Sequence, residues 1–187
     1  WSPWKETLIL QLYRNTRDYL SESPNAGKEE LATEFEEIRT EMKRSLNEKH
    51  YEIFEEHFKL MPRRYFRFRS KRSIRKHIVA LWQFIDRRAR RPDTPFECAV
   101  QWLERPKFGY TELIIAARET PLLLEKTCCS LAVHEMNILS ADIYTRPDGI
   151  VLDLFRVCTK DFKAEENRSR QKAVVKTLYG INESDNY

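Results

Sequence analysis

The chain has 187 residues, enough for one domain or two small ones. Apolar residues make up 41% and charged residues 33%, a balance typical of a globular protein with a well-solvated surface. The net charge of +4 does not indicate a general nucleic-acid-binding protein, and no apolar run approaches the roughly 20 residues of a membrane helix.

The four cysteines favour a reduced, cytoplasmic protein. They are Cys98, Cys128, Cys129 and Cys158, and no two of them form a CxxC pair, so a zinc ribbon or a redox motif is not indicated. Each lies in an apolar periodic segment, where cysteine behaves as a small hydrophobic residue. We expect no metal and no cofactor. The chain opens at Trp1 without a signal peptide, so we expect a piece of a longer protein with no membrane partner.

Helical spacing of apolar residues dominates the first half. Ser2 and Pro3 match an N-cap followed by proline at the first helical position. The pattern predicts four helices, at residues 3–20, 31–46, 51–61 and 70–85, with Ser70 as the cap of the last.

After Pro92 the period changes from helical to that of strands. The pattern predicts strands at residues 96–103, 113–117, 138–145 and 150–157, and helices at 121–135 and 164–179, the second ending at Gly180. Leu124, Thr127, Cys128 and Leu131 are the predicted buried face of the first of these helices. The strand 150–157 is apolar on both faces except at Asp153 and Arg156, which is typical of a central strand or of one that meets a partner. The fold class is therefore α+β.

No pattern of catalytic residues stands out. The four histidines lack the spacing of a metal site, no GxSxG occurs, and four glycines leave no phosphate-binding loop. We therefore expect no catalytic residue and no metal ligand in this chain.

A loop at Glu119–Leu122 is the best candidate for a binding site. Thr120 is placed to cap the following helix and Pro121 to start it, so the first amide groups could receive a carboxylate. Asn137 could add a side-chain amide nearby. The alternative is that Thr120 satisfies the helix end and that nothing binds.

Residues 62–76 carry only basic charges, with Tyr65, Phe66 and Phe68 among them. Aromatic and arginine side chains together can stack on bases, so an RNA-binding module using residues 63–76 is an alternative function. Without a recognisable motif we do not expect nucleic acid as a partner.

The residues around that loop resemble an ACT domain. They are Glu119-Thr120-Pro121, then Leu123-Leu124, Leu131 and Asn137-Ile138. The resemblance implies a ferredoxin-like βαββαβ unit, an antiparallel four-stranded sheet with two helices on one face, that pairs with another ACT unit and binds a small amino acid. The ligand-binding residues it implies are Glu119, Thr120, Leu122, Leu123, Asn137 and Ile138.

A narrower resemblance covers nearly the whole chain. WSPWKETLILQLYRNTRDYL, MPRRYFRFRSKRSIRKHI and ADIYTRPDGIVLDLFRV resemble, in this order, three parts of the bifunctional protein-PII uridylyltransferase/uridylyl-removing enzymes. The resemblance implies a helical segment at 1–92, comprising the end of a phosphohydrolase region and linker helices. An ACT-like domain at 93–180 and a tail at 181–187 would follow.

In functional terms, the resemblance implies a non-catalytic, glutamine-sensing segment of a nucleotidyltransferase that controls nitrogen metabolism. The protein PII would be its partner through the parent enzyme. The ACT unit would pair as a homodimer or, within one chain, with a second ACT domain. An ACT regulator of another amino-acid enzyme remains an alternative.

The chain departs from the ACT pattern in three places. Leu122 and Glu135 stand where glycine is usual, and no strand is predicted after the last helix. We predict that residues 96–103 fill the missing sheet edge by pairing with residues 113–117.

Overall fold

The computed structural model describes residues 3–21, 28–62, 65–66 and 69–184. The chain forms two compact units, Trp1–Val79 and Ala80–Tyr187, and the border between them falls inside one long helix. Among the described residues, no helix is long and apolar enough to cross a membrane.

The first unit is helical, as the spacing predicts. Its helices are α1 (Pro3–Ser21), α2 (Lys28–Ser45), the short 3₁₀ helix η1 (Glu48–His50), α3 (Tyr51–Leu60) and the first half of α5 (Lys71–Arg90). Pro3 is the first residue of α1, while the predicted cap Ser2 lies outside the described residues. The Ser70 hydroxyl accepts a hydrogen bond from the Ser73 amide at 3.2 Å, which confirms the predicted cap of α5.

Aromatic side chains fill the core of this unit. The Tyr65 hydroxyl lies 2.7 Å from Nδ1 of His77, and both side chains are buried. Phe58 packs against Phe35 and Phe66, with ring centroids 4.2 and 4.6 Å apart. Tyr65 and Phe66 are 0% and 1% exposed, so they are core residues rather than a stacking surface for bases.

The second unit is built on one antiparallel sheet. Its strands are β1 (Cys98–Arg105), β2 (Tyr110–Arg118), β3 (Asn137–Thr145) and β4 (Ile150–Cys158), in the order β1-β2-β4-β3. The 3₁₀ helix η2 (Pro106–Phe108) and Gly109, with φ 72°, turn the chain from β1 to β2.

Two sequence predictions about the sheet are confirmed. β1 pairs antiparallel with β2, from Cys98 opposite Ala117 to Arg105 opposite Tyr110, so it fills the edge that a strand after the last helix would otherwise occupy. β4 lies between β2 and β3, which explains why Leu152 and Leu154 are buried as well as Val151 and Phe155.

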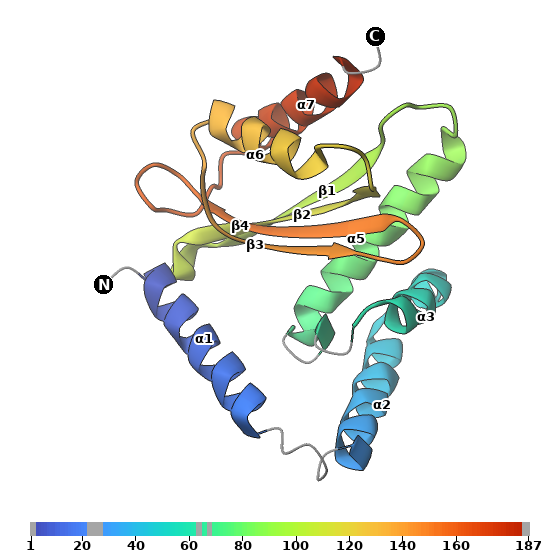
Figure 1. Ribbon diagram of the computed structural model, residues 1–187. Coiled ribbons are helices and arrows are strands. Elements are labelled where there is room, and N and C mark those ends of the chain that lie inside the picture. The colour runs from blue at the N-terminus through green and yellow to red at the C-terminus, as the bar shows by residue number, and fades with distance from the viewer. Residues whose placement is uncertain (1–2, 22–27, 63–64, 67–68, 185–187) are drawn as a thin grey trace. The chain divides into compact units, whose positions relative to one another are not determined.

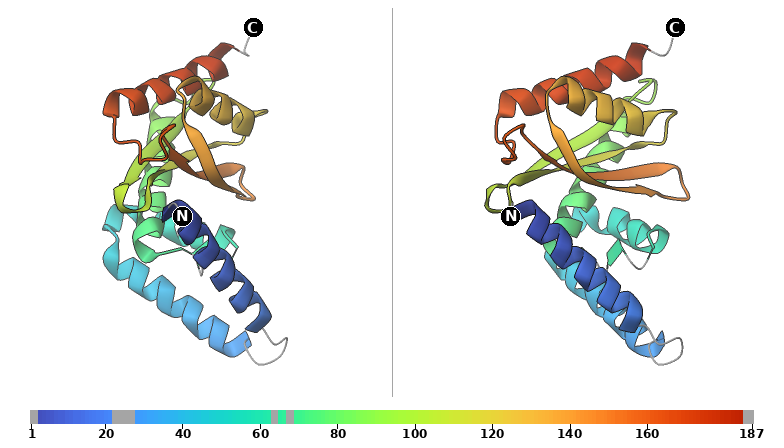
Figure 2. Two further views of the ribbon diagram at one scale, coloured as in Figure 1. Left: turned by 90° about the vertical axis from the view of Figure 1, so that its left-hand side faces the viewer. Right: turned by 60° about the vertical axis from the view of Figure 1, so that its left-hand side comes forward.

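Helices α6 (Leu123–Val133) and α7 (Arg168–Ser184) lie on one face of the sheet (Figures 1 and 2). This is the ferredoxin-like α+β arrangement that the sequence predicts. The core between the sheet and these helices, the helix-side core, draws residues from β2, β4, α6 and α7. Nearly or fully buried in it are Leu113, Ile115, Phe155, Leu131 and Leu178. The end of α5 meets the other face, where the Gln83 and Gln101 amide groups are 3.3 Å apart.

The predicted ends of the last helix are wrong at both sides. α7 begins after Asn167, whose side-chain oxygen accepts hydrogen bonds from the Ser169 and Arg170 amides at 2.9 and 3.2 Å. At the other end, Gly180 lies inside the helix, because the apolar stripe of Val174 and Leu178 continues to Ile181 and keeps the last turn against the unit. Residues 181–184, predicted to have no structure, are therefore helical.

Candidate functional site

The loop between β2 and α6 forms the candidate binding site, the β2–α6 loop (residues 119–122). It begins where β2 ends, and the Glu119 amide donates a hydrogen bond to the Gly149 carbonyl at 2.9 Å. This bond ties the loop to the turn between β3 and β4. The loop is thus held at both ends, by β2 and by the first turn of α6.

The start of α6 differs from the prediction. Leu122 has φ 59°, in the left-handed region, and α6 begins at Leu123 rather than at Pro121. A left-handed residue cannot continue a right-handed helix, so Pro121 lies in the turn before it. Instead of capping the helix, the Thr120 hydroxyl is buried without a hydrogen-bond partner among the described residues, and the Thr120 carbonyl accepts from Leu123 at 3.3 Å.

The two residues that replace the usual glycines both have left-handed backbones. Leu122 and Glu135 each have φ 59°, a conformation that glycine adopts without cost and other residues rarely adopt. Both positions therefore have a backbone conformation that glycine favours, although leucine and glutamate occupy them.

The leucines after Pro121 point in different directions. Leu123 is 5% exposed and belongs to the core, whereas Leu124, predicted to be buried, is 41% exposed. The buried positions of α6 are Leu123, Thr127, Ser130 and Leu131, because the late helix start places Leu123 over the sheet.

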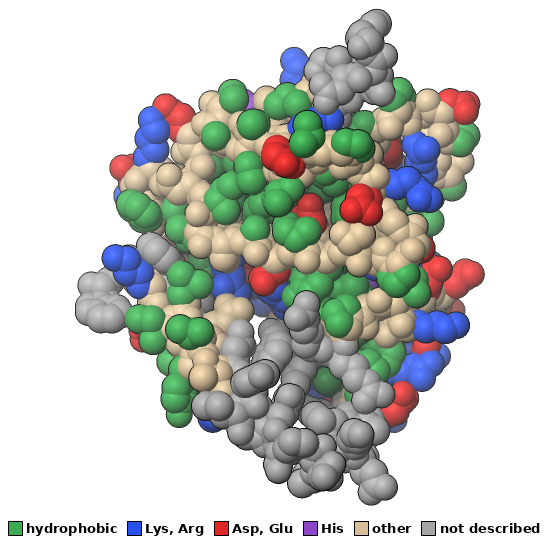
Figure 3. Space-filling model, viewed as in Figure 1, with side chains coloured by type: hydrophobic (Ala, Val, Ile, Leu, Met, Phe, Trp, Pro, Cys, Tyr) green, Lys and Arg blue, Asp and Glu red, His purple; other side chains and the backbone are tan. Residues whose placement is uncertain are grey.

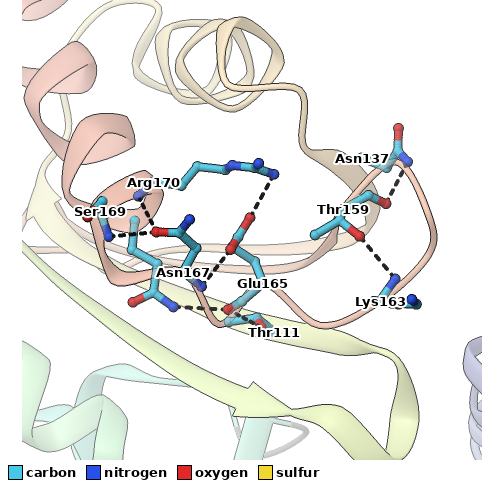
Figure 4. Close-up of polar contacts among 9 residues, drawn as sticks. Thr111, Asn137, Thr159, Lys163, Glu165, Asn167, Ser169 and Arg170 are labelled. Atoms are coloured by element: carbon cyan, nitrogen blue, oxygen red, sulfur yellow. Dashed lines mark hydrogen bonds and ion pairs between the residues drawn. The ribbon is translucent and has the colours of Figure 1, made fainter.

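Asn137 and Ile138 lie at the opposite end of the sheet from the β2–α6 loop. Asn137 pairs with Cys158 and its side-chain amide donates to the Thr159 carbonyl at 3.2 Å (Figure 4), whereas Arg118, the last residue of β2, pairs with Ile150. Ile150 and Cys158 are the two ends of β4, roughly 26 Å apart at about 3.3 Å per residue. The structure brings Glu119, Thr120, Leu122 and Leu123 together, but it does not bring Asn137 or Ile138 to them within one copy.

Polar contacts anchor the segment that follows β4. The Glu165 carbonyl accepts hydrogen bonds from Thr111 and Gln171 at 3.0 Å each, and the Glu165 carboxylate pairs with Arg170 at 3.0 Å (Figure 4). These contacts fix the start of α7 to β2.

Two buried charged residues were not assigned a role from the sequence. The Arg146 side chain is fully buried and donates two hydrogen bonds to the Asp148 carboxylate. One runs from Nε to Oδ1 at 3.1 Å and the other from Nη2 to Oδ2 at 2.6 Å. The sequence signal for this contact is Pro147-Asp148-Gly149, a combination typical of a turn. Asp153 is 2% exposed in the middle of β4, and burial raises the pKa of its carboxyl to about 7.

Exposed apolar side chains gather over α6 and β3 (Figure 3). We define the α6–β3 surface as Leu122, Leu124, Val133, Ile138 and Ile143, which are 39–67% exposed. Because β3 is an edge strand, this surface continues into unpaired backbone groups.

The described residues show neither a group that could hold a metal ion nor four buried cysteines. Within those residues, no three His, Cys, Asp or Glu side chains form a group that could hold a metal ion. Cys129 is exposed rather than buried. Of the basic segment, Arg63, Arg64, Arg67 and Phe68 lie outside the described residues.

Comparison with known proteins found relatives of one kind. Over 183 residues the chain is 28% identical to a bifunctional uridylyltransferase/uridylyl-removing enzyme from Rhodospirillum rubrum, a match covering 97% of this chain and 18% of the relative. A second enzyme of this name, from Pasteurella multocida, is 26% identical over 183 residues, covering 95% and 20%.

The chain spans about a fifth of the length of these curated relatives. No protein-family model and no solved structure matches it. The two relatives confirm the resemblance seen in the sequence: over nearly its whole length, this chain is similar to a segment of the bifunctional uridylyltransferase/uridylyl-removing enzymes.

Proposed function

We propose that residues 93–180 form an ACT-type regulatory module that binds an amino acid, specifically glutamine. The whole protein would be a protein-PII uridylyltransferase/uridylyl-removing enzyme that controls nitrogen metabolism. The observation that carries this proposal is the β2–α6 loop, where the buried Thr120 hydroxyl, without a hydrogen-bond partner among the described residues, lies beside the start of α6.

The loop offers complementary groups for an amino acid. The amide groups of the first turn of α6 favour a carboxylate, because they carry the positive end of the helix dipole. Glu119 is exposed and supplies a negative charge for an ammonium group. The Thr120 hydroxyl can donate to or accept from the same ligand, which would satisfy a group that is costly to bury alone.

Pairing of two modules would complete the site. Asn137 and Ile138 lie too far from the β2–α6 loop of their own copy, so in this proposal a second module would bring an equivalent pair to it. The α6–β3 surface, with exposed leucines beside the loop and an open strand edge, supports such pairing. The partner would be a second copy of the chain or a further ACT domain of the same protein.

The test is a calorimetric titration of the 187-residue chain with L-glutamine, comparing the natural chain with Thr120→Val. Valine has the shape of threonine without the hydroxyl. We expect Thr120→Val to bind glutamine about tenfold more weakly, while the ligand-free chain unfolds at a higher temperature because a buried unpaired hydroxyl is gone.

Thr127→Val is the matched control. The Thr127 hydroxyl is buried in α6 but donates to the Leu123 carbonyl at 2.8 Å, so its loss should lower stability and leave glutamine affinity unchanged. A natural chain that gives no saturable heat with glutamine would contradict ligand binding by this module.

The RNA-binding alternative loses its main support, because Tyr65 and Phe66 are core residues. A module that regulates another amino-acid enzyme would have the same geometry, and titration with the other amino acids tests it. The uridylyl-transfer and uridylyl-removing reactions are proposed for the whole protein and not for the residues of this chain.

A further inference from the structure

A cavity lies at the β1 edge of the sheet. It has a volume of about 310 Å³ and lies between β1, the first turns of α7 and the end of α5, all within residues 80–187. Because β1 and β3 are opposite edges of the sheet, this cavity is separate from the α6–β3 surface. Its principal lining residues are Arg87, Val100, Trp102, Arg168, Lys172 and Val175.

The charge of the cavity wall is positive. Three of its lining residues are cations and none is an acid. Arg87 donates a hydrogen bond to the Cys98 carbonyl at 3.0 Å and lies 4.0 Å from the Glu97 carboxylate, and Arg168 forms an ion pair with Glu104 at 3.1 Å. The exposed Lys172 has no ion-pair partner in the described part of the chain, so the wall keeps charge available for an anion.

The rest of the wall is apolar and includes an aromatic ring. Val100 and Trp102 of β1 pack against the helix-side core and leave part of their surface in the cavity. A tryptophan face stacks on flat rings such as nucleobases. The volume is at the lower end of the roughly 300–1,000 Å³ of small-molecule sites, which favours a small metabolite over a dinucleotide.

We propose that this cavity binds a small aromatic anion of the size and chemistry of a nucleoside monophosphate. The phosphate lies against Lys172 and the two arginines, and the base stacks on Trp102. The ligand would contact α5, β1 and α7 together, so its binding would stabilise the attachment of both flanking helices to the sheet.

The test is calorimetric titration of the 187-residue chain with AMP, adenosine and inorganic phosphate, without any amino acid present. We expect saturable binding of AMP, and binding of adenosine or phosphate weaker by at least about tenfold, since each lacks one of the two interactions. Phosphate binding as tightly as AMP would overturn the stacking role of Trp102, and an absence of AMP binding would overturn the site.

Variants locate the binding. Lys172→Glu and Trp102→Leu should each weaken AMP binding by about tenfold or more, whereas Lys107→Glu, an equal charge change outside the cavity, should not. Because Lys172 is exposed, Lys172→Glu should fold normally. Its AMP affinity therefore tests the site even if Trp102→Leu fails to fold. Equal AMP affinity in the Lys172 and Lys107 variants would contradict the proposal, whatever the outcome with glutamine.

Discussion

Leu122 carries the backbone of a glycine with the side chain of a leucine. Its φ of 59° costs about 1 kcal/mol for a residue with a Cβ, and its side chain is 59% exposed, so little packing offsets that cost. We expect Leu122→Gly to raise the free energy of unfolding by about 1 kcal/mol, as measured by urea denaturation.

Leu124→Gly is the control for this change. Leu124 is also exposed but lies in α6, where glycine lowers helix stability by about 1 kcal/mol. Two variants with the same loss of stability would show that Leu122 is helical, as the sequence predicts for a helix that starts at Pro121.

Asp153 makes stability depend on pH. Its pKa is about 7 in the folded chain and about 3.8 when unfolded, because burial disfavours the charged carboxylate. Because the folded pKa is the higher one, the contribution of Asp153 to the free energy of unfolding is fully present below pH 3.8. It is lost as the pH rises from 3.8 to 7. At about 1.4 kcal/mol per pH unit, the loss amounts to about 4 kcal/mol.

Asp153→Asn removes this titration. We expect the variant to gain stability relative to the natural chain by up to about 4 kcal/mol between pH 4 and pH 7, measured by urea denaturation at several pH values. A difference between the two chains that stays constant over this range would mean that Asp153 is not protonated when folded.

At the level of elements, α7 offers a test of where a helix ends. Gly180 lies inside the helix, and a Cβ built there meets no atom within 4 Å. Gly180→Ala should therefore stabilise the chain by about 1 kcal/mol in thermal unfolding. If Gly180 were the left-handed terminator that the sequence suggests, alanine would destabilise the chain by a similar amount.

The elements that the sequence predicts well are those with a clear period and a strong boundary. Apolar and polar residues alternate over residues 96–103 and a turn follows them, which predicts a strand at the sheet edge beside β2. The antiparallel register of β1 with β2 confirms this prediction. The starts of α6 and α7 were misplaced because Thr120 and Ala164 look like helix beginnings in sequence. α6 starts after the left-handed backbone of Leu122, and α7 starts after Asn167, whose side chain caps it; the apolar period reveals neither feature.

The candidate site shows the same division. Glu119, Thr120, Leu122 and Leu123 adjoin along the chain, so the sequence predicts their proximity, and the structure brings them together. Asn137 was placed near them because its strand follows α6, but α6 carries the chain back across the sheet before β3 begins. The order of residues along the chain therefore does not reveal that Asn137 lies at the other end of the sheet.

At the scale of the whole molecule, the chain consists of a helical unit and a sheet unit joined through α5. The border between the compact units lies at Val79 and Ala80. The domain boundary near residue 92 is a separate matter and remains a prediction from the sequence.

Pairing of the sheet units is the step on which the proposed function depends most. Leu124 lies in the α6–β3 surface without being part of the core, so Leu124→Glu should leave the monomer folded and prevent pairing. Circular dichroism checks the fold of this variant, and its light-scattering mass checks the loss of the dimer. A Leu124→Glu chain that still pairs would place the interface elsewhere.

The most direct test of the proposed function is sedimentation velocity of the 187-residue chain during a titration with L-glutamine, with D-glutamine as the control. A ligand held between two copies must strengthen their association by binding linkage. We predict a saturable shift from monomer to dimer with L-glutamine alone, and none in Leu124→Glu. A chain that sediments as a monomer at every glutamine concentration would contradict an amino-acid site formed by paired modules.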